Sequence, residues 1–224
     1  MTDDVETTSR RLTDQGRERK QQLVDAAVAL FSARGYAATR IADICDAAGV
    51  AKGLFYWYFP TKQALFEELV RTMRRRLRVA QADAMVPAAD PVTRLRQGTE
   101  ASVRFIAANA SYFTLVEVER TDPHLADSVA KVLQEGSDVY LRDVLALVRD
   151  AQSDGLLPDV DPRLASLGVL GAVSSFGHAW RNGRIAGIDA DELAEFVGEW
   201  VVRALGAPTL STGAADRAEL TGRS

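Results

Sequence analysis

Three Asp-Pro pairs limit strongly what this chain can fold into. Asp90-Pro91, Asp122-Pro123 and Asp161-Pro162 each place a side-chain acceptor directly before a proline. An aspartate caps free amides at a helix start, and a proline fits the first helical position without losing a hydrogen bond. Each pair therefore predicts a helix start. Asp189 predicts another, because Glu192 can reach back to it in a capping box.

Apolar residues between these starts repeat at the period of an α-helix. Val24, Val28 and Phe31 share one stripe of a helix expected over residues 14–34, which Gly35 ends. No convincing strand pattern appears, so we expect an all-α fold. Further helices are expected after a capping Thr39, between Val50 and Pro60, after a capping Thr61, and near residues 91–109, 111–120, 123–153, 162–181 and 190–206.

The charges are distributed unevenly along the chain. The net charge is −4, but residues 10–78 hold 14 Lys and Arg against 7 Asp and Glu, and residues 81–224 hold 13 against 21. A basic front and an acidic rear indicate that the first part of the chain meets an anionic polymer.

Residues 35–65 contain two short helices joined by a glycine turn, the layout of a helix-turn-helix motif. Gly49 stands where the chain changes direction, and a residue without Cβ can adopt a positive φ there. Phe55 and Phe59 are one helical turn apart and are expected to pin the third helix to the first. A plain hydrophobic core explains these two rings but not the run 56–58, Tyr-Trp-Tyr, so some of those rings are expected to face DNA.

The same segment resembles the amino-terminal part of the TetR family of regulators. The residues that carry the resemblance are Gly35-Tyr36, Thr39, Ile41, Ile44, Ala48-Gly49-Val50, Lys52-Gly53, Phe55-Tyr56, Tyr58-Phe59 and Lys62. The resemblance implies a homodimer formed by the last two helices, and repression that a small molecule relieves. It also implies a three-helix DNA-binding domain (14–60) followed by a helical ligand-binding and dimerisation domain (61–206). Residues 1–13 are expected to form a flexible arm, and residues 207–224, which are rich in Ala, Thr, Gly and Ser, are expected to form a disordered tail.

The resemblance transfers DNA-contacting roles to particular positions. It puts Thr39, Tyr56, Tyr58 and Lys62 against phosphates, and Lys52, Gly53, Leu54 and Trp57 near base edges. Leu54 can offer only an apolar contact, such as one to a thymine methyl, whereas Lys52 can donate to guanine. Arg40 stands where the family often has Ser or Thr and is expected to make a charge-assisted phosphate contact.

Three further features of this region affect the interpretation. Ala51 replaces the serine that often caps the recognition helix, and such a loss costs about 0.5–2 kcal/mol. Cys45 is interpreted as a small buried residue rather than a redox switch. The basic residues from Arg10 to Lys20 can form a minor-groove arm or a solvated face, and the sequence does not choose between them.

The last two helices predict a dimer interface, because an apolar helix pair needs covering on more than one side. An internal bundle without a dimer is the alternative. The expected interface residues are Leu170, Val173, Leu193, Phe196, Val197, Trp200 and Val201.

A mixed set of aromatic and polar residues in the rear domain is expected to contact an unidentified small-molecule effector that is mostly apolar with a polar handle. Each residue taken alone is more typical of a core. The set comprises Phe105, Tyr112, Phe113, Glu117, Tyr140, Phe176, His178 and Trp180.

An enzyme is the main alternative, but the chain carries no phosphate loop, zinc-protease motif or nucleophile elbow. The single cysteine forms no internal disulfide, and we expect no cofactor and no metal. Residues 164–180 are nearly uncharged, yet their glycines and serines favour a helix buried in protein over a membrane span. The expected partners are double-stranded operator DNA, a second copy and the effector, in the cytoplasm. An activator, or an architectural DNA binder without an effector, remains open.

Overall fold

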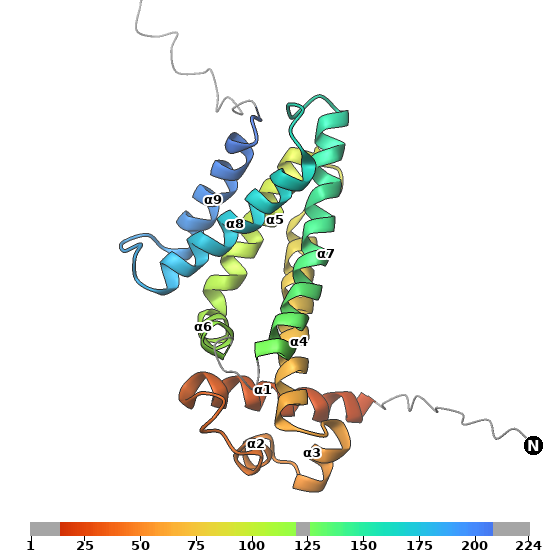
Figure 1. Ribbon diagram of the computed structural model, residues 1–224, viewed down its shortest axis with the longest axis vertical. Coiled ribbons are helices and arrows are strands. Elements are labelled where there is room, and N and C mark those ends of the chain that lie inside the picture. The colour runs from red at the N-terminus through yellow and green to blue at the C-terminus, as the bar shows by residue number, and fades with distance from the viewer. Residues whose placement is uncertain (1–13, 120–125, 208–224) are drawn as a thin grey trace, which may run out of the picture. The chain divides into compact units, whose positions relative to one another are not determined.

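A computed structural model of the chain describes residues 14–119 and 126–207, and the regular elements within them are all helices (Figure 1). The all-α prediction is therefore confirmed. None of these described helices is long and apolar enough to cross a membrane. The helices are α1 (Asp14–Arg34), α2 (Ile41–Ala48), α3 (Lys52–Tyr58), α4 (Lys62–Ala84), α5 (Pro91–Ala108), α6 (Ala110–Glu119), α7 (Ala126–Ser153), α8 (Pro162–Arg181) and α9 (Ala190–Ala204).

Most of the predicted helix starts are confirmed at the level of their hydrogen bonds. The Asp90 carboxylate accepts the amide of Thr93 at 2.9 Å, and the Asp161 carboxylate accepts the amide of Arg163 at 2.9 Å. Asp189 and Glu192 form the reciprocal capping box that their spacing predicts. The predicted start at Asp122-Pro123 lies outside the described residues.

The predicted cap of α2 is wrong. Thr39 does not cap this helix, because the N-cap residue is Arg40, whose amide donates to the Asp43 carboxylate at 3.1 Å. The Thr39 hydroxyl instead donates to the carbonyl of Gly35 at 2.8 Å. Thr61 does cap α4 as predicted, since its hydroxyl accepts the amide of Ala64 at 3.0 Å.

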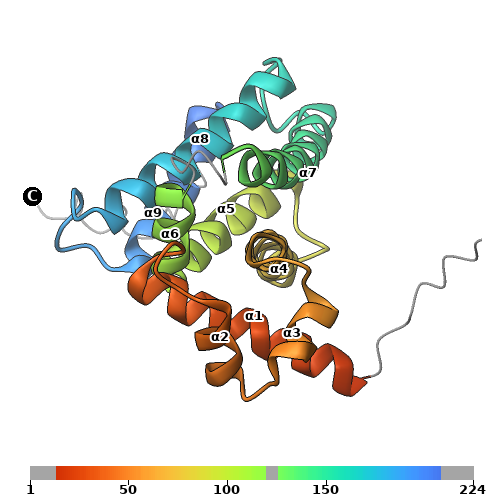
Figure 2. The ribbon, with the colours of Figure 1, turned by 60° about the horizontal axis from the view of Figure 1, so that its bottom comes forward.

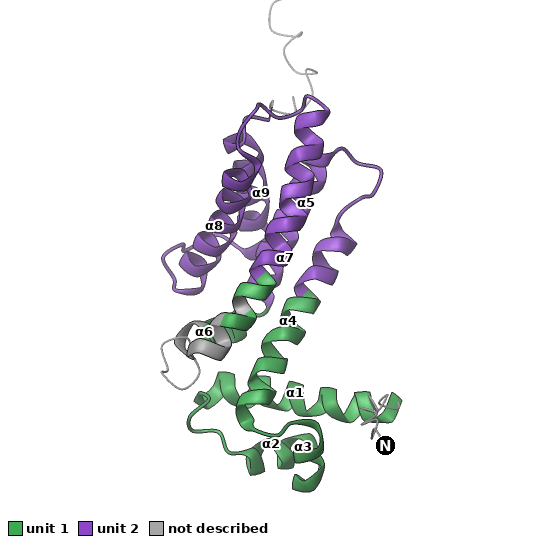
Figure 3. Ribbon diagram, turned by 45° about the vertical axis from the view of Figure 1, so that its right-hand side comes forward, with its two compact units in different colours: residues 1–76, 109–136 green, residues 77–108, 137–224 purple. Residues whose placement is uncertain are grey.

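The chain divides into two compact units (Figure 3). The first unit runs through Arg76 and also includes Asn109–Gly136. In it, α1 packs against α2 and α6, and Figure 2 shows α1, α2 and α3 gathered around the first turns of α4. Phe31 of α1 lies 5.8 Å from Phe66 of α4 between ring centroids. An apolar core therefore holds the helix-turn-helix segment to its own unit.

The second unit comprises Leu77–Ala108 and the chain from Ser137 onward. Its α5 packs along α9 and α8, around a core that includes Leu95, Val148 and Val197. An ion pair joins α5 to α9, since Arg104 Nε lies 2.7 Å from Asp191 Oδ1. Within α5, Arg104 Nη1 also lies 3.2 Å from Glu100 Oε2. This packing fixes which sides of α8 and α9 stay exposed.

Candidate nucleic-acid interface

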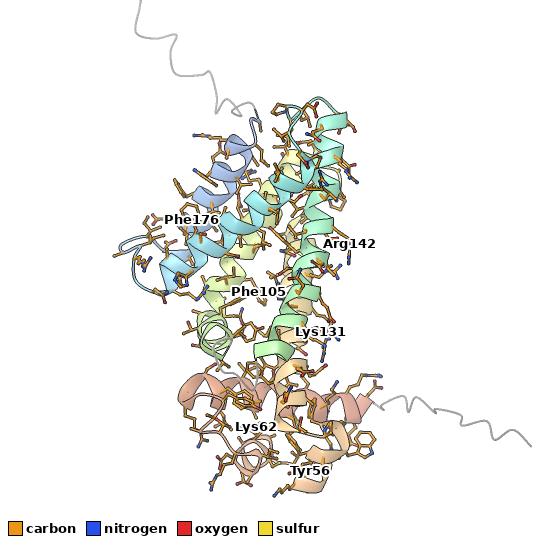
Figure 4. The ribbon with its side chains drawn as sticks, viewed as in Figure 1. Tyr56, Lys62, Phe105, Lys131, Arg142 and Phe176 are labelled. Atoms are coloured by element: carbon orange, nitrogen blue, oxygen red, sulfur yellow. The ribbon has the colours of Figure 1, made fainter. Side chains whose placement is uncertain are left out.

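Helix α3 has one buried and one exposed face, as the sequence predicts. Phe55 is fully buried and Phe59 nearly so, and their ring centroids are 5.9 Å apart. Tyr56 and Trp57 keep 49% and 51% of their surfaces exposed. Figure 4 shows Tyr56 on the outer side of the helix-turn-helix segment. The hydrophobic anchor thus turns two large aromatic side chains toward solvent.

A glycine turn sets the direction of α3. Gly49 has φ +65° and ends α2, and its amide donates to the Asp46 carbonyl at 3.2 Å. A Cβ at this position would meet nothing within 4 Å, so the requirement for glycine is conformational rather than steric. Ala51 then starts α3 with no side-chain cap, in agreement with the predicted loss of the usual serine.

The exposed side of α3 brings together four of the predicted DNA-contacting residues. Lys52 and Gly53 are exposed beside Tyr56 and Trp57, and a Cβ on Gly53 would also meet open space. Leu54 and Tyr58 are partly exposed. Side chains able to donate hydrogen bonds and to make apolar contacts therefore lie along one short helix, as a major-groove reader requires.

Arg40 lies exposed at the start of α2 and is paired with an acid. Its guanidinium Nη2 lies 2.9 Å from Asp43 Oδ1. Hydrogen bonds from Arg40 hold the pKa of the Asp43 carboxyl below its usual range. The Arg40 side chain is itself exposed, and an ion pair with one exposed partner contributes little to stability, so this cation can exchange partners at small cost. Arg40 therefore remains a candidate for a phosphate contact.

Thr39 and Lys62 have structural contacts that the sequence did not reveal. Thr39 is fully buried, so in this conformation its side chain cannot reach a phosphate. Lys62 Nζ donates to the carbonyls of Tyr36 and Thr39 at 2.8 and 2.9 Å, and it lies 4.1 Å from the centre of the Tyr36 ring. The amine ties the start of α4 to the segment between α1 and α2.

We expect Lys62→Met to destabilise the protein rather than to remove a DNA contact. Loss of two charged hydrogen bonds at a partly buried site should lower the free energy of unfolding by about 1–2 kcal/mol. Chemical denaturation of this variant and of Lys52→Met checks this, because the same change at exposed Lys52 should leave stability unchanged. If Lys62→Met matched wild-type stability but flattened the salt dependence of DNA binding, the structural role would be wrong.

The predicted dimer residues fall on two different sides of the last helices. Leu193, Val197 and Val201 lie in the core of a single protomer, and Val173 of α8 is also buried. They cannot form a contact surface, because a step of four residues keeps all three α9 members on the inner face. Leu170 is partly exposed. Phe196 and Trp200 are 55% and 46% exposed.

An exposed apolar face of α8 and α9 surrounds those two aromatic residues. Phe176 of α8 connects them, with ring centroids 5.7 Å from Phe196 and 5.8 Å from Trp200. Leu164 and Leu167 continue the face along α8, at 68% and 52% exposure. The sequence analysis missed these two leucines, although their apolar character on a nearly uncharged helix was a usable signal. We call these five residues the α8/α9 face.

The predicted effector residues are divided between the two compact units. Tyr112 and Phe113 belong to the first unit, whereas Phe105 and Tyr140 belong to the second. The side chain of Glu117 lies outside the described residues. The three residues of α8 have other contacts: Phe176 belongs to the α8/α9 face, His178 Nε2 lies 2.9 Å from Asn182 Nδ2, and Trp180 Nε1 donates to the Ile188 carbonyl at 3.2 Å.

Two protein-family models match successive parts of this chain. Residues 23–69 match the family model described as bacterial regulatory proteins, tetR family. Residues 88–205 match the one described as tetracyclin repressor-like, C-terminal domain. The two matches cover the helix-turn-helix segment and most of the chain that follows it.

Individual proteins that are similar to this chain are also named as transcriptional or metabolic regulators. The HTH-type transcriptional regulator TtgR of Pseudomonas putida is 25% identical over 179 residues, which cover 76% of this chain and 84% of that protein. The HTH-type transcriptional repressor KstR2 of Mycobacterium tuberculosis is 34% identical over 86 residues, 38% of this chain and 43% of that protein. The structure of the fatty acid degradation regulator FadR from Bacillus halodurans superposes with a TM-score of 0.71 at 23% identity, covering 85% and 97% of the two chains.

Proposed function

The chain belongs to the tetR family of bacterial regulatory proteins, and from this membership we propose that it represses transcription by binding a palindromic operator as a homodimer. The family consists of transcription factors that bind DNA and small ligands and that dimerise. What is proposed for this chain is the set of residues that read the operator and the kind of molecule that releases it.

The observation that carries the proposal is the exposed side of α3. Tyr56 and Trp57 expose about half of their surfaces on a helix of seven residues, which a domain that met only water would not need, and basic Lys52 stands beside them. Helix α3 would enter the major groove, with Lys52, Leu54 and Trp57 near base edges and Tyr56 and Tyr58 near phosphates. Arg40 would add a phosphate contact from α2.

Selection of DNA fragments from the source genome by the purified protein supplies the operator for testing this reading. Leu54 is proposed to contact a thymine methyl, so replacing single thymines by uracil in the selected duplex should weaken wild-type binding by roughly 1 kcal/mol at one position per half-site. The same uracil should cost nothing in Leu54→Ala. If every uracil duplex binds both proteins alike, Leu54 does not read the operator.

The α8/α9 face is proposed as the dimer interface. A two-fold axis would bring the Phe176, Phe196 and Trp200 cluster of one protomer against the same cluster of its partner, which would remove the exposed rings from water. Gly168 and Gly171 support this arrangement, because each is exposed and a Cβ there would meet nothing within 4 Å. A partner helix would thus have room to approach closely.

The division of labour along the chain is also a proposal. Residues 14–60 would read DNA, and residues 61–206 would bind the effector and dimerise. Helix α4 belongs to both compact units, with the division between Arg76 and Leu77. A ligand that binds differently to two arrangements of these units would change operator affinity, and a coupling of about 1–3 kcal/mol corresponds to about 5- to 150-fold.

A further inference from the structure

Arg74 differs from the other arginines of α4. Arg71, Arg75, Arg76 and Arg78 all form ion pairs, with Glu67, Glu68, Asp25 and Asp143 respectively. Arg74 forms no ion pair and no hydrogen bond within the described residues, although it is partly buried. Burial lowers the pKa of its guanidinium below the usual value. A desolvated cation without a counter-charge is unfavourable.

Two residues of other helices enclose this guanidinium, all within the first unit. Gly136 of α7 gives it room, because a Cβ there would lie 3.0 Å from Arg74 Cδ and 3.1 Å from Nε. Tyr112 of α6 is buried and interacts electrostatically with Arg74. Burial raises the pKa of Tyr112 above its usual value, so its hydroxyl stays protonated and is a donor. Two groups that can donate thus lie together without an acceptor in the described part of the chain.

Apolar residues stand near these groups. One helical turn from Arg74, Tyr112 and Gly136 there is in each case a buried aliphatic residue, and the three are Val70 on α4, Val116 on α6 and Val132 on α7. Arg74 itself keeps partial exposure, which leaves a path for a ligand. The chemistry matches a molecule with an anionic end and an apolar body.

We propose that Arg74 and Tyr112 bind the carboxylate of an apolar organic acid. A single guanidinium neutralises a monoanion and offers the planar fork that suits two carboxylate oxygens, whereas a phosphate dianion would leave excess charge in an apolar site. The site rests on the geometry of the first unit. Its role as the effector site of the operator switch rests in addition on the proposed function.

Calorimetric titration of the full-length protein tests the site with defined probes. The probes are decanoate and 2-naphthoate, each with the alcohol of the same carbon skeleton, and inorganic phosphate. At least one carboxylate should bind, and its alcohol should bind at least about tenfold more weakly. Arg74→Met should weaken the carboxylate about 10- to 100-fold, the loss expected for a charged hydrogen bond. Arg78→Met, one turn along α4 on an exposed arginine, should bind like wild type.

Each alternative outcome has a definite meaning. The proposal is overturned if neither carboxylate binds, if the alcohols bind equally, if phosphate alone binds, or if Arg74→Met retains full affinity. Thermal melting shows whether a loss of carboxylate binding in Arg74→Met is caused by unfolding of the variant. Arg74→Met should melt at or above the wild-type temperature, since it replaces an unpaired cation by an apolar chain of similar length. A lower melting temperature would mean that Arg74 has an internal partner, which would also overturn the proposal.

Operator binding separates this site from the proposed function. If the carboxylate binds through Arg74 and weakens operator binding, linkage requires the operator to weaken carboxylate binding by the same factor. If the carboxylate binds but leaves operator affinity unchanged, the carboxylate site is confirmed and its role in the operator switch is wrong. If the protein binds the operator but no carboxylate, the DNA-binding proposal is supported and the carboxylate site is wrong.

Discussion

Trp200→Asp should give a folded monomer that no longer binds the operator tightly. Trp200 lies at the centre of the α8/α9 face, and a dimer contact there would bury an aspartate without a counter-charge. The protomer should survive, because its core uses Leu193, Val197 and Val201 on the opposite side of α9. A monomer holds one half-site, so we expect operator affinity to fall about 1,000-fold or more, toward non-specific levels.

Val79→Asp is the matched control for this substitution. Val79 is also a large apolar residue more than half exposed, but it lies on α4 and away from the α8/α9 face. The variant should sediment as a dimer and bind the operator like wild type. If Trp200→Asp sediments as an intact dimer and binds the operator with undiminished affinity, the dimer interface lies on a surface other than the α8/α9 face.

Phe55→Ala and Tyr56→Ala should have opposite consequences although the residues are adjacent. Phe55 is fully buried under α3, and its truncation should lower the free energy of unfolding by about 3–5 kcal/mol. Tyr56 points outward, so Tyr56→Ala should leave the melting temperature almost unchanged. It should instead weaken operator binding, because a phosphate contact is lost.

Denaturation and fluorescence anisotropy on the two variants separate these effects. For Tyr56→Ala, operator and scrambled duplex should weaken alike, since phosphate contacts carry no sequence information. A stable Phe55→Ala protein would contradict the anchoring role of the buried face of α3. A Tyr56→Ala protein with wild-type affinity for both duplexes would remove Tyr56 from the interface.

The local rules of helix formation made most of the fold predictable. Helix α1 has the predicted bounds, and the caps at Asp90, Asp161 and Asp189 form because aspartate before a helix satisfies free amides in any context. Thr39 failed as a cap because α2 begins one residue later than predicted: Arg40 is the N-cap residue, Asp43 satisfies its amide, and the Thr39 hydroxyl donates to the Gly35 carbonyl. These contacts depend on the path of the chain, which the residue pattern does not describe.

The candidate site was predictable only in part, because burial depends on neighbours. The apolar residues of α9 look like one stripe in the sequence, yet packing on α5 buries Val197 and leaves Trp200 half exposed. Lys62 has the charge of a phosphate ligand, but two carbonyls from another segment hold its amine. Arg74 sits in a run of arginines that is typical of a solvated surface, and only the positions of Tyr112 and Gly136 reveal that it is desolvated.

The central claim is that a dimer of this chain reads DNA through α3, and a salt series on two duplexes tests it most directly. Anisotropy should be measured for the full-length protein on the selected palindromic duplex and on a scrambled duplex of the same composition. We expect the palindrome to bind about 1,000-fold or more tightly. The logarithm of affinity should fall linearly with the logarithm of salt, with a slope of about −0.9 per neutralised phosphate. Equal binding of the two duplexes, or binding that does not change with salt, would contradict the claim.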